Sequence, residues 1–264
     1  LALGIGASTA VFSAVHAVLL RPLPYGEPQN LLQIQTRYGG SVGAISPAEY
    51  LDYRDRLTDV VSDVGIYSMG SVTLTGDGDP RILRTAFISA GYFPALAVQP
   101  VLGRPFSREE EDAGESVVLI SEALWRTQLG EDPEVLGKSL TLNGVANRVI
   151  GVMPDSARVP EDLLTGQSVH ILAPHGIVAA NVDNRGSHYL NGIARLEKGV
   201  SHANAKDAFE NLGRWMVQTY GDGYPDGMDF QVTTEELARA IQGPVRTPLR
   251  VLGAAVFFVM LVAS

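Results

Sequence analysis

The sequence predicts an α+β fold in which two β-α-β blocks flank an inserted segment, with an apolar segment at each end of the chain. Three observations support this prediction. Strand and helix periods of hydrophobicity alternate in residues 22–105 and again in residues 186–248. Residues 106–185 follow a different pattern, and residues 1–20 and 251–264 contain no Asp, Glu, Lys or Arg. The 264 residues, of which 45% are hydrophobic, are enough to form a large buried core.

The two uncharged segments are predicted to enter a membrane. A membrane-spanning helix needs about 20 apolar residues, which residues 1–20 nearly provide and residues 251–264 begin to provide. Small residues such as Gly6 favour close helix packing in lipid. We expect residues 1–21 to be the C-terminal part of a first transmembrane helix and residues 249–264 the start of a second, in a fragment of a larger membrane protein. The alternative is that both segments are buried helices of a soluble enzyme.

The charge and cysteine content exclude several classes of function. The net charge is −9, and no basic cluster appears, so we expect no nucleic-acid partner. The absence of cysteine excludes disulfides, thiolate catalysis and Cys-ligated metal sites. All 29 acidic residues lie in residues 22–248. Because a long acidic segment between two membrane spans is readily translocated, this part of the chain is expected on the extracytoplasmic side.

The first block is predicted to have the order β-α-β-β-β. Leu32, Ile34 and Thr36 alternate with polar neighbours, as in a half-buried strand. The run Ser46-Pro47-Ala48-Glu49 combines a capping box with proline at the first helical position, so residues 46–58 should form a helix. Three strands follow at residues 64–67, 72–75 and 82–88, the last two joined by a turn at residues 76–80.

The second block is predicted to repeat the β-α-β order. A strand at residues 188–196 leads to Ser201, which should cap a helix. The helix carries one apolar stripe, formed by Ala205, Phe209, Leu212, Trp215, Met216 and Tyr220. Residues 222–227 end this helix, and a strand at residues 230–233 follows. A last short helix is expected between Thr234 and Gly243-Pro244.

The segment between the blocks is predicted to be an inserted subdomain. It should contain a strand at residues 117–120, a helix at 121–129, a hairpin at 139–152 that turns at Asn143-Gly144, and loops over 154–185. The blocks on either side should then form one split domain. We therefore expect the strands near residues 31–37 and 188–196 to lie in one sheet.

Three short motifs resemble ligand-binding loops but lack the required context. Gly137-Lys138-Ser139 resembles a P-loop, yet Asp132 stands where the first glycine belongs and no helix follows. Gly4-Ile5-Gly6 resembles the start of a dinucleotide-binding fingerprint, but no strand precedes it. Residues 222–227 resemble the start of a calcium loop that would end on Thr233 instead of Glu. We therefore predict no cofactor site.

Histidines and carboxylates are the remaining candidates for chemistry. A general base or metal ligands could come from His170 (predicted in a strand), His175, His188 and His202. No metalloprotease helix motif and no nucleophile elbow accompanies them. The other candidates are the carboxylates of Asp52, Asp55, Glu109, Glu110, Glu111 and Asp112, and charge runs are typical of solvated faces. We predict no catalytic residue and no metal site.

The order of several motifs resembles the MacB/FtsX-type permeases with a MacB-like periplasmic core domain, and among them the large permeases common in acidobacteria. The resemblance covers essentially the whole chain. It is carried by residues 1–25 (LALGIGASTAVFSAVHAVLLRPLPY), 46–56 (SPAEYLDYRDR), 89–107 (SAGYFPALAVQPVLGRPFS), 117–144 (VVLISEALWRTQLGEDPEVLGKSLTLNG), 149–154 (VIGVMP) and 194–205 (ARLEKGVSHANA).

The resemblance implies a non-enzymatic domain between the first two membrane helices of an ABC transporter permease. It implies a split Porter-like subdomain at residues 22–105 and 186–248, with a Sabre-like subdomain inserted at 106–185. Implied partners are the lipid bilayer, a cytoplasmic ATP-binding subunit or domain and a second permease copy. The implied function is coupling of ATP hydrolysis to periplasmic movement (mechanotransmission) for export, at the bacterial inner membrane with residues 22–248 in the periplasm.

Two other classes of function stay open at this point. The first is a membrane-anchored sensor or solute-binding domain, which would need one deep cleft with aromatic walls. The second is a membrane-anchored hydrolase or metalloenzyme built on His170, His175 and His188 with nearby acids, which would need these side chains to converge in one pocket.

Overall fold

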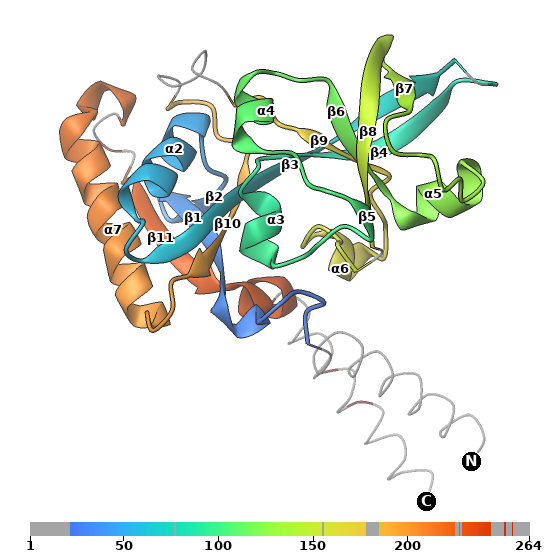
Figure 1. Ribbon diagram of the computed structural model, residues 1–264. Helices are drawn as coiled ribbons and strands as arrows, with labels where there is room; N and C mark the ends of the chain where they lie inside the picture. The colour runs from blue at the N-terminus through green and yellow to red at the C-terminus, as the bar shows by residue number, and fades with distance from the viewer. Residues whose placement is uncertain are drawn as a thin grey trace, which may run out of the picture.

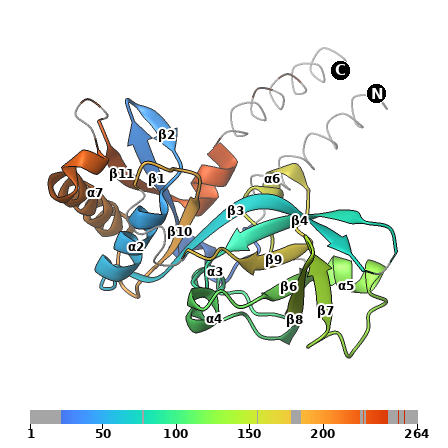
Figure 2. The same cartoon turned by 90° about the horizontal axis from the view of Figure 1, so that it is seen from above.

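Eleven strands of the described residues form one mixed sheet that runs through two lobes of the molecule (Figure 1, Figure 2). The computed structural model describes residues 22–243 except 77, 155, 178–184, 225, 226 and 228, together with residues 251 and 255. Within these residues, no helix is long and apolar enough to cross a membrane. The two predicted transmembrane segments, 1–21 and 249–264, lie outside the described residues apart from 251 and 255.

The first lobe combines residues from both predicted blocks. Its strands are β1 (Leu31–Tyr38), β2 (Ser41–Gly43), β10 (Asn191–Leu196), β11 (Gln231–Glu236) and the first half of β3 (Val61–Thr75). β1 pairs antiparallel with both β10 and β11, which confirms that the strands near 31–37 and 188–196 lie in one sheet. Helices α2 (Pro47–Arg56) and α7 (His202–Thr219) cover one face (Figure 1) over a core that includes Tyr53, Ile66 and Phe209.

The second lobe contains most of the predicted insertion. Its strands are the second half of β3, β4 (Arg81–Ile88), β5 (Leu102–Gly103), β6 (Val117–Ser121), β7 (Ser139–Leu142), β8 (Val145–Met153) and β9 (Ile171–Pro174). The other labelled helices are α3 (Tyr92–Leu96), α4 (Arg108–Asp112), α5 (Glu122–Gln128) and α6 (Asp162–Thr165). The 3-10 turns η2 (Pro28–Asn30), before β1, and η4 (Gly221–Gly223), after α7, flank first-lobe elements. β4 pairs with β9 and β6 pairs with β8 in parallel, whereas the other described pairs are antiparallel.

Strand β3 is longer than the sequence predicts. Separate strands are expected at residues 64–67 and 72–75, but one strand of 15 residues covers both, so that prediction is wrong. β10 pairs with the part of β3 up to Tyr67, and β4 pairs with the part from Tyr67 onwards. Gly70 stands in the middle, where a Cβ would lie 2.9 Å from the ring of Phe87. The glycine therefore allows close cross-strand packing instead of breaking the strand.

Part of the segment predicted to be loops is regular structure. Strand β9 and helix α6 lie within residues 154–185, so the prediction is wrong for these two elements. Ile171 is fully buried because β9 lies between β4 and β6 and pairs with both. A strand of four residues is too short to show a period in the sequence. β10 also begins at Asn191, three residues after the predicted start.

The predicted caps and the predicted hairpin are confirmed. The side chains of Ser46 and Ser201 each accept a hydrogen bond from the backbone N–H three residues later. The hairpin of β7 and β8 turns at Asn143-Gly144, where both residues have positive φ. At the other end of the chain, β11 extends past Thr234 to Glu236, so the helix expected between Thr234 and Gly243 begins at residue 237.

The sheet is continuous between the lobes because β3 passes from one to the other (Figure 2). A cluster of buried apolar side chains also crosses between them. It includes Leu31 and Ile193 from first-lobe strands and Leu119 and Ile150 from second-lobe strands. A displacement of one lobe therefore acts on packed core residues of the other.

Candidate functional site

Helix α2 carries two buried carboxylates, Glu49 and Asp52, near its start. Ser46 Oγ accepts a hydrogen bond from the Glu49 N–H at 3.3 Å, and Glu49 Oε2 accepts one from the Ser46 N–H at 2.8 Å. This is the predicted capping box, with Pro47 at the first helical position. The cap uses only one carboxylate oxygen of Glu49. The other oxygen is therefore available to partners outside the helix.

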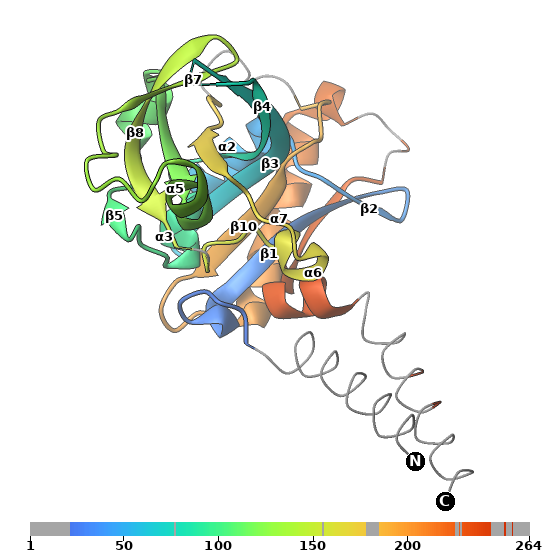
Figure 3. The ribbon, with the colours of Figure 1, turned by 90° about the vertical axis from the view of Figure 1, so that its right-hand side faces the viewer.

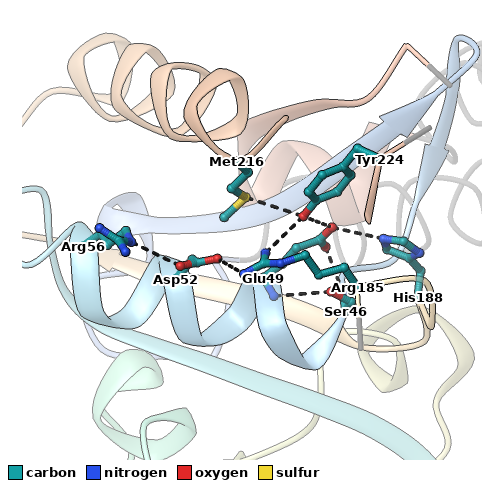
Figure 4. Close-up of polar contacts among 8 residues, drawn as sticks. All are labelled: Ser46, Glu49, Asp52, Arg56, Arg185, His188, Met216 and Tyr224. Carbon is teal, nitrogen blue, oxygen red and sulfur yellow. Dashed lines mark hydrogen bonds and ion pairs between the residues drawn. The ribbon is translucent and has the colours of Figure 1, made fainter. Parts of the chain in front are cut away.

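Glu49 joins three segments of chain that are distant in sequence (Figure 4). Its Oε1 lies 3.0 Å from His188 Nε2 and 3.1 Å from the hydroxyl of Tyr224. Because a carboxylate can only accept, His188 Nε2 and the Tyr224 hydroxyl are the donors. Burial raises the pKa of Tyr224, and the charge of Glu49 raises it further, so the hydroxyl keeps its proton. Glu49 is completely buried, and these donors satisfy a carboxylate that has left water.

Arg185 and Asp52 continue this cluster towards the surface (Figure 4). Arg185 Nη2 lies 2.7 Å from Asp52 Oδ2, and Arg185 Nη1 donates to the Tyr224 hydroxyl at 3.3 Å. The guanidinium of Arg185 also lies 3.5 Å from the ring centre of Tyr220. Asp52 Oδ1 accepts from Arg56 Nε at 3.1 Å. We call Ser46, Glu49, Asp52, Arg185, His188 and Tyr224 the buried polar network.

The buried polar network holds three parts of the chain together. Glu49 and Asp52 belong to the first block, Arg185 and His188 lie where the chain returns from the insertion, and Tyr224 follows α7. Breaking a buried ion pair by removing one partner is strongly destabilising. The network therefore fixes the position of α2 relative to the returning chain. In the sequence, Glu49 is recognisable only as a helix cap, and no local pattern points to Arg185 or Tyr224 as members of the network.

The structure does not bring the four candidate histidines together. His170 lies directly before β9, where its Nδ1 accepts from the Arg84 N–H at 3.2 Å. His175 lies directly after β9, with Nε2 3.0 Å from Ser68 Oγ. His202 Nε2 donates to the carbonyl of Gln29 at 2.8 Å. These contacts are in separate places, and only His188 contacts a carboxylate within 4 Å among the described residues.

The candidate carboxylates also separate. Asp55 forms an exposed ion pair with Arg54. In α4, Glu111 is buried and its Oε2 accepts from the Ala90 N–H at 2.8 Å, so the predicted solvated face does not include it. Burial raises the pKa of Glu111. No group of three or more His, Asp or Glu side chains in the described part of the chain could hold a metal ion.

Gly137 and Lys138, which resemble part of a P-loop, lie in an exposed turn before β7. The ammonium of Lys138 forms an ion pair with Asp132, the residue that stands in place of the first P-loop glycine. Ser139 starts β7, so a strand follows the motif instead of a helix. Gly4-Ile5-Gly6 lies outside the described residues, as do Pro225 and Asp226 of the segment with calcium-loop resemblance.

Residues 22–30, before β1, and the helical residues 237–243, after β11, lie together at one end of the molecule (Figure 3). Leu23 and Tyr25, before β1, belong to the same buried apolar cluster as Leu237 and Ile241, in the helical residues 237–243. We call residues 22–30 and 237–243 the base. The two ends of the domain are therefore joined to each other before either continues towards its predicted membrane segment.

Known proteins share sequence and fold features with this chain. The family model of the MacB-like periplasmic core domain matches residues 1–212. No curated protein matches the sequence. Three solved structures are similar in fold. One is a domain described as part of a permease from Porphyromonas gingivalis, with 17% identity over 80% of this chain and 92% of that chain and a TM-score of 0.59.

The second is the periplasmic region of MacB from Actinobacillus actinomycetemcomitans, with 16% identity over 89% of this chain and 97% of that chain and a TM-score of 0.56. The third is the extracellular domain of the ABC-type transporter YknZ from Gram-positive bacteria, with 16% identity over 76% of this chain and 99% of that chain and a TM-score of 0.51. Identities this low establish a common fold. Because the family model covers most of its length, the chain belongs to the family of MacB-like periplasmic core domains.

Proposed function

We propose that the chain is the extracytoplasmic domain of a MacB/FtsX-type ABC transporter permease, which couples ATP hydrolysis in the cytoplasm to movement outside the membrane. The observation that supports this proposal is the base, where residues from both ends of the domain share one apolar cluster. If residues 1–21 and 249–264 enter one bilayer, their polar backbone ends must meet its surface side by side. A shift of either membrane helix then reaches both ends of the domain.

The connections from the base into the sheet are short. Leu23 and Tyr25 are buried only a few residues before β1 begins at Leu31, and β11 ends at Glu236 directly before helical residues 237–243. Pro22 and Pro24 fix φ near −65° and leave little freedom to absorb a displacement. A shift of the membrane helices is therefore passed to β1 and β11, which pair with each other.

The proposal implies defined partners and a defined location. These are the lipid bilayer of a bacterial inner membrane, a cytoplasmic ATP-binding subunit or domain and a second permease copy, with residues 22–248 on the periplasmic side. The domain would act by transmitting motion and not by catalysis. In the family's terms, residues 22–105 and 186–248 would form a Porter-like subdomain, and residues 106–185 a Sabre-like one.

The proposal is tested by loosening the base in an intact transporter. Replacing Pro22 and Pro24 by Gly should leave the domain folded but lower the amount exported per ATP hydrolysed, because the connection to β1 becomes flexible. Pro133→Gly is the matched control, since Pro133 lies in an exposed loop of the insertion far along the chain from the base. Unchanged coupling in the Pro22/Pro24 variant would refute the mechanical role.

A further inference from the structure

A short segment of the insertion, residues 157–165, lies against the base (Figure 3). Val159 is fully buried, and with Ala157 and Leu163 it packs in the same apolar cluster as Leu23 and Leu237. The segment includes α6 and belongs to the part of the chain that returns from β8 towards β9. The insertion therefore shares one apolar cluster with both ends of the domain.

Polar contacts tie this segment to the start of the domain and to the second block. The Tyr25 hydroxyl donates to the carbonyl of Arg158 at 2.7 Å, across 133 residues of chain. The side-chain amide of Asn191, at the start of β10, donates to Glu161 Oε1 at 3.1 Å. Both contacts bind the segment to elements that continue directly into the first-lobe sheet.

A partly buried ion pair ties the same segment to strand β4. Asp162 is completely buried and its Oδ1 pairs with the guanidinium of Arg84. Among the described residues, Asp162 Oδ2 has no hydrogen-bond partner, so its charge depends chiefly on Arg84. The backbone of Arg84 also bonds to both the N–H and Nδ1 of His170. Arg84 thus joins the segment to the start of β9 as well.

Strand β4 carries this connection to the far end of the insertion. β4 pairs with β3 along residues 67–74, and β3 pairs with β7 at Leu74 and Thr75. β7 then forms a hairpin with β8. A force applied at the base therefore has two routes into the insertion, namely the long strands themselves and the contact through residues 157–165.

We infer that Asp162 and Arg84 are positioning residues that make the base and the insertion move as one body. This inference rests on the proposed function, because it states how motion at the base reaches the second lobe. Without the ion pair, the strands β3 and β4 and the shared apolar cluster would still connect the insertion to the base, but residues 157–165 would lose their charged link to β4. The insertion could then bend relative to the base. Such bending would dissipate part of a displacement before it reaches the β7–β8 hairpin.

The test measures distances in the full permease with its ATP-binding partner. These 264 residues contain no cysteine, and any cysteine elsewhere in the full permease or its partner is first replaced by Ser. Spin labels are then placed at Arg239→Cys, in the base, and at Val145→Cys, at the start of β8. Both side chains are exposed, at 70% and 54%. With labelled protein diluted by unlabelled copies, we expect one narrow distance distribution whose width does not change on addition of ATP.

Asp162→Asn should broaden this distribution and make it depend on ATP. Tyr25→Phe removes the hydrogen bond to the Arg158 carbonyl and keeps the ring in the apolar cluster, so it should broaden the distance distribution less. This variant replaces Asp162→Asn in the test if Asp162→Asn does not fold. Leu124→Ala is the stability control, because Leu124 is buried in the second-lobe core and lies apart from the base cluster. It should lower stability and leave the distribution narrow.

Two outcomes separate this inference from the proposed function. Narrow distributions in folded Asp162→Asn and Tyr25→Phe would overturn the inference, and so would equal broadening by Leu124→Ala. A single label at Arg239→Cys in each of two copies reports instead on motion of the base. If the distance between these copies does not respond to ATP in the otherwise unsubstituted permease, the proposed function fails, whereas the first measurement still decides how rigidly the insertion is held.

Discussion

Arg185 and Arg56 offer a matched test of the buried polar network. Both guanidinium groups pair with the carboxylate of Asp52, at 2.7 Å and 3.1 Å, and each lies over an aromatic ring, Tyr220 for Arg185 and Trp215 for Arg56. Their exposure differs, since 10% of the Arg185 side chain is accessible to water and 48% of the Arg56 side chain. Replacing each by Met removes the charge and keeps an unbranched apolar stem.

The exposure difference sets the expected magnitudes. A buried hydrogen bond that involves a charged group, here Arg185 Nη1 to the Tyr224 hydroxyl, contributes about 1.5–3 kcal/mol. A cation–π contact contributes about 0.5–1 kcal/mol when exposed and about 2 kcal/mol when desolvated. Because Arg56 still pairs with Asp52 in Arg185→Met, we expect this variant to lose roughly 3 kcal/mol of folding free energy. Arg56→Met loses a solvent-screened pair and an exposed cation–π contact with Trp215, so a loss of roughly 1–2 kcal/mol is expected.

The measurement is urea unfolding of residues 22–248 followed by circular dichroism. The corresponding regions of the three similar proteins have been crystallised as separate pieces, which supports working with this segment. The two variants should show the same dependence of free energy on urea and different midpoints. Equal losses for Arg185→Met and Arg56→Met, or a loss below about 1 kcal/mol for Arg185→Met, would refute the argument that burial makes this network important.

Three further predictions concern the same segment. Burial lowers the pKa of His175 below its ordinary value of 6.5, so the unfolded chain binds the proton first and the free energy of unfolding should fall as pH drops below about 6.5. His175→Gln should make this fall shallower, and identical pH profiles would contradict the prediction. Phe209→Ala should cost about 3–5 kcal/mol in the same urea assay, because Phe209 is fully buried under α7, and a loss under 1 kcal/mol would contradict it. The segment should neither bind nor hydrolyse ATP, and ATP turnover abolished by Lys138→Ala would show that the turn before β7 is a nucleotide site after all.

Local features of this fold are encoded by residues that are close in sequence. The capping box at Ser46 and Glu49, the cap at Ser201 and the turn at Asn143-Gly144 all depend on contacts within three or four residues. The apolar stripe of α7 repeats with the helical period for the same reason, and Phe209 lies on its buried face. The sequence therefore predicts these elements closely.

Pairing between distant strands is not encoded in this way. β9 is a short apolar run that becomes a strand only because β4 and β6 lie on either side of it. The two strands predicted at 64–67 and 72–75 become one because β10 and β4 pair along a continuous β3. Each outcome depends on neighbours that are many residues away, and a sequence window does not contain them.

In the buried polar network, too, some contacts are encoded by neighbouring residues and others depend on residues far away in the sequence. The sequence by itself determines that Glu49 caps α2, because its partner Ser46 is three residues away. Only the tertiary structure brings His188 and Tyr224 to its second oxygen, 139 and 175 residues further along the chain. The physical reason is that a cap forms within one helical turn, whereas a buried carboxylate takes its remaining donors from whichever segments the packing of the whole sheet places beside it.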